Sequence, residues 1–152
     1  MSQMCSRQIL FLCTGNYHRS RFAELFFNAL ARESALTWRA TSRGTDVEGS
    51  RRFIVGPISR QARKALADHG IDVRSALRDP LQLRMSDLDA ADLIVAICEA
   101  EHRPHIERDF PLAADRVQYW SVHDVPITPA DEALIAVAQH VRDLIEDLKQ
   151  RG

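Results

Sequence analysis

The sequence predicts an α/β fold in which helices cover both faces of a parallel sheet, a three-layer α/β/α arrangement. Two apolar runs, Ile9–Leu12 and Ala91–Ile97, have the length and composition of buried strands. Longer segments whose apolar residues recur at helical spacing follow them. Strands that alternate with helices form right-handed βαβ units, which build a parallel sheet. Ligands bind such sheets outside the carboxyl ends of the strands, where Cys13 and Cys98 are expected.

Length and charge limit the class of protein. The 152 residues suffice for one domain, 1–152, with residues 1–7 as a loose lead-in. The 20 basic and 21 acidic residues nearly balance, which argues against nucleic acid or a membrane surface as a partner. No stretch resembles a signal peptide or reaches the length of a membrane span. With three cysteines at no regular spacing, we expect a reduced, cytoplasmic protein.

Residue patterns place the elements of the first half. Phe22, Leu25 and Phe26 recur at helical spacing, and the alternation in Leu-Thr-Trp-Arg-Ala-Thr indicates a second strand. Gly70 has the position of a helix C-cap. The expected elements are a strand ending at Cys13, a helix over about 19–31, a strand over 36–41, a polar loop over 46–56 and a helix over 59–69.

The second half continues the alternation. Ser86 is positioned to cap a short helix, and Thr128 and Asp131 are expected to form a reciprocal cap on the last one. We expect His102 and His105 on a solvated helix face, with no metal site. The expected elements are a short helix over 85–91, a buried strand over 91–97, a helix to about 108, a strand over 116–119, a loop over 120–127 and a final helix from 128.

An eight-residue stretch, Cys13-Thr14-Gly15-Asn16-Tyr17-His18-Arg19-Ser20, joins the first strand to the first helix. A loop wrapped onto a helix N-terminus aims backbone N–H groups at one point, and the helix dipole favours an anion there. Gly15 and Asn16 tolerate left-handed backbone angles, and Arg19 can grip two oxygens of a phosphate-like group. The same field favours the nucleophilic thiolate form of Cys13, and Ser20 can donate to its sulfur. The expected anion-binding residues are Thr14, Gly15, Asn16, Tyr17, His18 and Arg19.

The pattern Cys-x5-Arg-Ser directly after an N-terminal strand resembles the low-molecular-weight protein tyrosine phosphatases and the related arsenate reductases. Ser42-Arg43-Gly44-Thr45, Gly56 with Ala62, and Gly70-Ile71-Asp72 extend the resemblance along the chain. It implies a flavodoxin-like sheet of four parallel strands in the order 2-1-3-4. It also implies hydrolysis of phosphomonoesters through a phosphocysteine intermediate, with no metal or organic cofactor.

The family's second catalytic group is an aspartate in an Asp-Pro pair after the last strand, which protonates the leaving oxygen and then activates water. Here that loop contains Trp120-Ser121-Val122-His123-Asp124-Val125-Pro126. Asp124 lies nearest to the expected position, so we expect it to be the general acid. Asp131 is a rival, although its expected cap role already accounts for it, and His123 is a weaker one. The other interpretation of Asp124 is an ordinary solvated loop residue.

Departures from the family pattern affect the expected chemistry. His18 stands where the phosphatases commonly have a second cysteine, so no disulfide can form within the loop. Cys98 stands where arsenate reductases have their second cysteine, and its role is either redox or that of a buried core residue. The third relay position is His105, and Cys5 is expected near the opposite end of the sheet. In the loop after the second strand, Phe53 is either one wall of a substrate cleft or part of an ordinary mobile loop.

From these residues we expect a phosphatase acting on protein phosphotyrosine or aryl phosphates. Cys13 attacks phosphorus while the loop amides and Arg19 hold the equatorial oxygens. Asp124 then acts as acid and base, and Ser20 eases departure of the thiolate. Phosphate, sulfate or arsenate are the expected oxyanion ligands. Two alternatives stay open: an arsenate reductase that uses the same loop, and a non-catalytic oxyanion-binding module.

Overall fold

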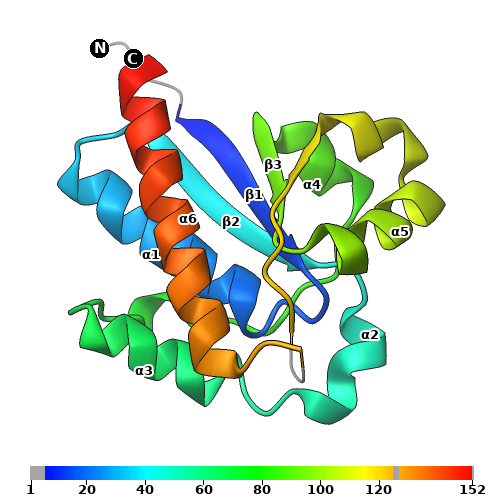
Figure 1. Ribbon diagram of the computed structural model, residues 1–152, viewed down its shortest axis with the longest axis horizontal. Helices are drawn as coiled ribbons and strands as arrows, with labels where there is room; N and C mark the ends of the chain where they lie inside the picture. The colour runs from blue at the N-terminus through cyan, green and yellow to red at the C-terminus, as the bar shows by residue number, and fades with distance from the viewer. Residues whose placement is uncertain (1–5, 125–126, 152) are drawn as a thin grey trace.

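A four-stranded parallel sheet forms the centre of the protein (Figure 1). The structure is a computed structural model that describes residues 6–124 and 127–151. The strand order is β2-β1-β3-β4, which confirms the predicted fold class and order. The strands are β1 (Arg7–Cys13), β2 (Trp38–Gly44), β3 (Leu93–Ala96) and β4 (Val117–Tyr119). Because all strands run in the same direction, their carboxyl ends meet at one edge, where Cys13 lies.

Helices cover both faces of this sheet and form the expected three layers (Figure 1). One face carries α1 (Arg19–Glu33), α3 (Arg60–Asp68) and α6 (Ala130–Arg151), and the other carries α4 (Met85–Ala90) and α5 (Glu99–Asp109). The chain also forms the short helix α2 (Val47–Ser50) and 3-10 turns at Arg51–Phe53, Arg74–Ala76 and Pro111–Arg116. No helix within the described ranges is long and apolar enough to cross a membrane.

The central strand β1 is buried on both sides. Ile9 and Phe11 pack with α1 and α6, whereas Leu10 and Leu12 pack with α4 and α5, and all four have no exposed surface. A strand between two helical layers needs such a continuous apolar run, because neither face meets water. The packing fixes the carboxyl end of β1 and therefore the position of Cys13.

β2 differs from its prediction, because it begins two residues later and runs on through Gly44. Its last residues pair with the end of β1, with Gly44 opposite Cys13. A Cβ on Gly44 would lie 2.6 Å from the carbonyl oxygen of Thr14, closer than real Cβ atoms come to other atoms. Only glycine therefore lets β2 reach the loop that follows β1. β3 is shorter than the predicted 91–97 because its pairing with β1 runs only from Leu93 to Ala96.

Two predictions about the chain between β2 and β3 are wrong. The expected polar loop over 46–56 is partly helical, because the Asp46 carboxylate accepts the backbone N–H of Gly49 at 3.0 Å and starts α2. Ser86 does not cap α4. The N-cap is Arg84, whose backbone N–H donates to the Asp87 carboxylate at 2.9 Å.

The reciprocal cap predicted for the last helix is also wrong. α6 begins at Ala130, and the backbone N–H of Thr128 donates to the carbonyl of Asp124 at 3.1 Å. The Asp131 carboxylate accepts the N–H of the next residue, Glu132, at 3.2 Å. One apolar stripe of α6 faces the core: Leu134, Val137, Val141, Ile145 and Leu148 are buried, and Leu144 is partly buried against the same core.

Candidate active site

The loop between β1 and α1 brings a thiol and a hydroxyl together. Cys13 ends β1, and its Sγ lies 2.9 Å from the Oγ of Ser20, in the first turn of α1. His18 occupies the N-cap position of α1, but its ring contacts Ser59 at 2.5 Å and the Ala130 carbonyl at 3.1 Å instead of capping the helix. The first N–H groups of α1 therefore remain available to an anion beside the thiol.

Asn16 fixes the shape of this loop. It has a left-handed backbone angle, φ 51°, and its side chain is fully buried. Its Nδ2 donates to the hydroxyls of Ser20 and Ser42, both at 2.9 Å. Its Oδ1 accepts from Arg78 at 2.9 Å and from the N–H of Leu81 at 3.0 Å. One amide thus ties the loop to α1, to β2 and to the segment before α4.

Gly15 serves the loop in another way than expected. The left-handed position is Asn16 alone, and Gly15 instead makes room for a neighbouring segment. A Cβ on Gly15 would lie 3.2 Å from the Cβ of Ser50, at the end of α2. Close packing against α2, rather than backbone conformation, is the reason for a small residue here.

Arg19 lies almost wholly inside the protein, with 2% of its side chain exposed. Its Nη1 and Nη2 donate to the two oxygens of Glu101 at 3.0 and 2.8 Å, and Nη1 also donates to the Val122 carbonyl at 2.7 Å. Burial alone lowers the pKa of this guanidinium, but interactions with Cys13 and Glu101 outweigh it, so the pKa is raised. Arg19 therefore stays charged at the mouth of the loop.

The same pairing sets the pKa of the Glu101 carboxylate, which lies in the first turn of α5. Burial by itself raises its pKa, but the hydrogen bonds and charge of Arg19 outweigh burial and lower the pKa to about 2. Glu101 is not among the site residues expected from the sequence. No local motif marks it, because its partner lies 82 residues away in the chain.

Asp124 lies beside Arg19. Its Oδ2 is 3.6 Å from Nη2 of Arg19, and half of its side chain is exposed. Its backbone N–H donates to Glu101 at 3.1 Å, which anchors this part of the loop after β4.

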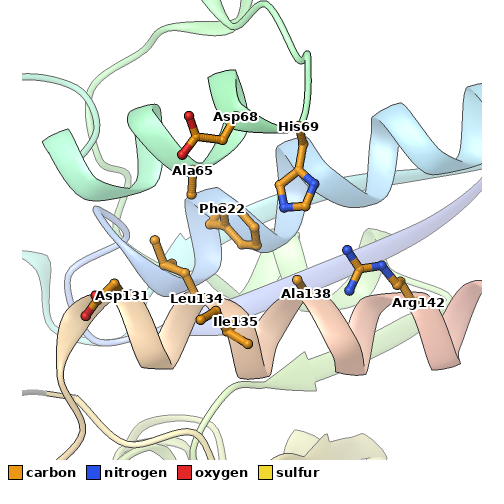
Figure 2. Close-up of a pocket in the computed structure, with 9 residues that line it drawn as sticks. All are labelled: Phe22, Ala65, Asp68, His69, Asp131, Leu134, Ile135, Ala138 and Arg142. Atoms are coloured by element: carbon orange, nitrogen blue, oxygen red, sulfur yellow. The ribbon is translucent and has the colours of Figure 1, made fainter.

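The rival for the acid role, Asp131, instead lines a groove of about 300 Å³ between α3 and α6 (Figure 2). None of the residues that line this groove belongs to the Cys13–Arg19 loop. The lining residues are Phe22, Ala65, Asp68, His69, Asp131, Leu134, Ile135, Ala138 and Arg142.

His102 does not lie on a solvated helix face, contrary to the prediction. It is fully buried, its Nδ1 accepts the N–H of Cys98 at 3.0 Å, and its Nε2 lies 3.1 Å from the hydroxyl of Thr14. Burial and the charge of Arg19 lower its pKa to about 3, so the ring is neutral. Since Nδ1 accepts, the network assigns the proton to Nε2, which donates to Thr14. His105, three residues further along α5, contacts the Thr45 hydroxyl at 2.8 Å.

Cys98 is fully buried at the N-cap of α5, and its Sγ lies 3.4 Å from Nδ1 of His123. Burial raises the pKa of this thiol. The donor atoms of Cys98, Glu101 and His123 lie within 4.8 Å of one another, and zinc takes such ligands. Both oxygens of Glu101 already bind Arg19, however, whose positive charge disfavours a cation. The third cysteine, Cys5, lies outside the described residues.

A side-chain hydrogen bond joins the anion loop to the segment after β2. The Tyr17 hydroxyl donates to the carbonyl of Val55 at 2.8 Å. Phe53, 69% exposed, lies in a 3-10 turn under the guanidinium of Arg52, 4.9 Å from the ring centre. Phe53 therefore lies on a short 3-10 turn with most of its ring exposed, and its part in a substrate cleft stays a prediction.

A thiol at the end of the first strand, an anion-binding loop and an arginine at the following helix define a cysteine-dependent enzyme class that acts on oxyanions. Residues 8–149 match the family described as low molecular weight phosphotyrosine protein phosphatase, and the chain belongs to that family.

Two relatives that match nearly the whole chain are arsenate reductases. The chain is 30% identical to an arsenate reductase of Halalkalibacterium halodurans over 143 residues, covering 93% of this chain and 91% of that protein. It is 29% identical to an arsenate reductase of Oceanobacillus iheyensis over 151 residues, covering 95% and 93%.

Solved structures agree with the fold. A low molecular weight protein tyrosine phosphatase from T. tengcongensis superimposes with a TM-score of 0.77 at 28% identity, covering 93% of this chain and 99% of that chain. YfkJ from Bacillus subtilis superimposes with a TM-score of 0.83 at 21% identity, covering 99% of both chains. The second likeness supports the fold alone.

Proposed function

We propose that the protein is a cysteine-dependent phosphatase that hydrolyses phosphomonoesters, with phosphotyrosine or an aryl phosphate as substrate. The observation that carries this proposal is the position of Asp124, half exposed and 3.6 Å from Arg19. An acid in this place can reach the leaving oxygen of a phosphate that Arg19 holds, because general acids act within hydrogen-bond reach.

The first step uses the buried end of β1. The Cys13 thiolate attacks phosphorus, and the bond to the ester oxygen breaks as the bond to sulfur forms. The loop amides and Arg19 stabilise the charge that develops on the equatorial oxygens. Asp124 gives its proton to the departing oxygen.

The second step regenerates the thiolate. Asp124, now a carboxylate, takes a proton from water, whose oxygen attacks the phosphocysteine. Phosphate leaves, and the electron pair of the phosphorus–sulfur bond returns to Cys13. The Ser20 hydroxyl, 2.9 Å from the sulfur, stabilises the thiolate as it forms.

Arsenate reduction is the second candidate function, because the relatives described above are arsenate reductases and Cys98 follows β3. In that chemistry the Cys13 thiolate binds arsenate with loss of water. A second thiol then attacks the Cys13 sulfur, so that arsenite leaves and a disulfide forms. The two thiols supply the two electrons. His105 stands at the third relay position, so an external thiol is needed to reduce the enzyme again.

A side-by-side assay separates these functions. Wild-type enzyme is tested for hydrolysis of p-nitrophenyl phosphate without reductant, and for arsenate reduction with thioredoxin or glutaredoxin systems. We expect hydrolysis, and we expect Cys98→Ala to leave it nearly intact while costing about 1 kcal/mol of stability. Efficient arsenate reduction that disappears in Cys98→Ala, together with negligible hydrolysis, contradicts the phosphatase proposal.

A further inference from the structure

We propose that Glu101 is a positioning residue, which holds one edge of the Arg19 guanidinium so that the other edge faces the oxyanion. This inference rests on the proposed function, because it concerns the same loop. Glu101 comes from α5 and Arg19 from α1, and Nη1 and Nη2 of Arg19 donate one hydrogen bond each to the two oxygens of Glu101, at 3.0 and 2.8 Å.

A guanidinium has five N–H groups arranged in a plane. Glu101 takes one from Nη1 and one from Nη2, and the Val122 carbonyl takes the other from Nη1. The remaining N–H groups, on Nε and Nη2, form the side edge of the same plane. That edge is a second fork, and a fork of this geometry binds two oxygens of a phosphate. The protein carboxylate and the oxyanion can therefore bind Arg19 at the same time.

The placement of Glu101 is itself fixed by the site. Its Oε2 accepts the backbone N–H of Asp124 at 3.1 Å, and its Oε1 lies 3.5 Å from the hydroxyl of Thr14. Thr14 is held in turn by the buried ring of His102, the next residue on α5. One helical turn thus joins the start of the anion loop, the arginine and the segment that carries the candidate acid.

Attraction of the substrate does not explain a carboxylate at this position. A negative charge next to Arg19 repels an incoming dianion and weakens binding. Holding the Arg19 guanidinium in one orientation instead favours the reaction, because a misplacement of about 1 Å at a reacting centre can cost about 100-fold in rate. Glu101 should therefore favour the transition state, in which charge develops on the oxygens, more than it favours ground-state binding.

The test compares Glu101→Gln with Glu99→Gln. Glu99 lies in the same turn of α5, but its carboxylate pairs with Arg103 and is 49% exposed. With p-nitrophenyl phosphate, we expect Glu101→Gln to lower kcat by about 10- to 100-fold with a smaller change in KM. Glu99→Gln should match wild type. Equal kinetics for both variants contradict the proposal.

A double-mutant cycle asks whether Glu101 acts through Arg19. Arg19→Lys removes the planar fork, so Glu101→Gln should cause little further loss of kcat in that background. Additive losses contradict a positioning role.

A binding measurement keeps this test independent of the reaction. In a Cys13→Ser background, inorganic phosphate is titrated while the Arg19 side-chain nitrogens and the Glu101 carboxyl carbon are followed by NMR. We expect the Nε signal of Arg19 to move and the Glu101 carboxyl to keep its acidic titration. If phosphate instead displaces Glu101 from Arg19, the titration of the Glu101 carboxyl moves towards neutral pH. Glu101 and the oxyanion then do not bind Arg19 at the same time, and the proposal is wrong. If the Glu101 result holds but hydrolysis is absent, only the phosphatase proposal fails.

Discussion

At the scale of single residues, Arg19 and Asn16 of the anion loop are held by partners from distant parts of the chain. Glu101 holds Arg19 across 82 residues, and Arg78 holds Asn16 across 62. These contacts fix the loop before any ligand arrives, because the polar atoms involved are already paired. Substitutions at the partners should therefore change activity, although the partners do not touch the substrate.

Asp124→Asn should slow hydrolysis by an amount that depends on the leaving group. A good leaving group such as p-nitrophenolate needs little protonation in the transition state, whereas an unactivated phenol or an alcohol needs more. Loss of a positioned acid typically costs roughly 100- to 10,000-fold. We expect the largest loss with the poorest leaving group, measured as kcat over a series of phosphomonoesters.

Asp131→Asn is the control for this variant. Asp131 lies on α6 and lines the groove between α3 and α6, so we expect little change in kcat for any ester. Its loss should lower stability by at most about 1 kcal/mol, through the contact with the N–H of Glu132. A kinetic defect that follows Asp131, or equal slowing of good and poor leaving groups by Asp124→Asn, assigns the acid role elsewhere.

At the scale of elements, the site depends on the meeting of β1, β2 and α5 at one edge of the sheet. β2 approaches the loop closely only because its last residue is Gly44. A methyl group there would lie 2.6 Å from Val47 as well as from the Thr14 carbonyl, and 3.0 Å from the backbone nitrogen of Asn16. Two of these three neighbours are backbone atoms, which cannot rotate away.

Gly44→Ala should therefore damage both stability and anion binding. We expect a loss of about 1–3 kcal/mol in the free energy of unfolding, the usual cost of overpacking, and at least tenfold weaker binding of inorganic phosphate. Gly70→Ala is the control: its φ of 74° makes alanine strained, but nothing lies within 4 Å of the added methyl. It should lower stability and leave phosphate affinity unchanged. Equal phosphate affinity in both variants contradicts the proposed contact.

Elements with a local signal could be predicted from the sequence. The apolar run before Cys13 and the run around Ile94 indicate buried strands, and both are central strands of the sheet. The end of β2 has no such signal, since Ser-Arg-Gly becomes a strand only by pairing with β1. The same holds for α2, a single turn that one aspartate cap starts.

The candidate site also contains residues that a local sequence pattern marks and residues that no such pattern marks. Cys13, Arg19 and Ser20 form a motif within eight residues, so their proximity could be predicted from spacing alone. Glu101 and His102 carry no such pattern, and two histidines three residues apart on a polar helix look like a solvated face. Their burial results from the packing of α5 against the loop, which only the folded chain defines.

At the scale of the whole molecule, buried titratable groups make stability fall in acid. His102 has a pKa of about 3, below its usual 6.5, so the unfolded chain binds more protons between these values. Burial lowers the pKa of His18 in the same direction. Glu101 has a pKa of about 2, below its usual 4.5, so it also lowers the free energy of unfolding as the pH falls, in a more acidic range. All three groups therefore favour the folded state at neutral pH.

We expect the free energy of unfolding in urea to fall by about 1.4 kcal/mol per pH unit below roughly pH 6.5 from His102 alone. His102→Gln keeps an acceptor for Cys98 and a donor for Thr14 but cannot titrate. It should show a shallower slope, by close to one proton, between about pH 6.5 and 4.5. Identical slopes in the two proteins show that His102 is not the buried neutral ring described above.

The most direct test of the phosphatase proposal is to locate the phosphoryl group during turnover. Wild-type enzyme hydrolysing p-nitrophenyl phosphate is quenched in acid within one turnover and digested, and its peptides are analysed by mass spectrometry. We expect one phosphoryl group on Cys13, accumulating further in Asp124→Asn and absent in Cys13→Ser. Turnover without phosphocysteine, or a phosphoryl group on another residue, contradicts the assignment of Cys13 as the nucleophile.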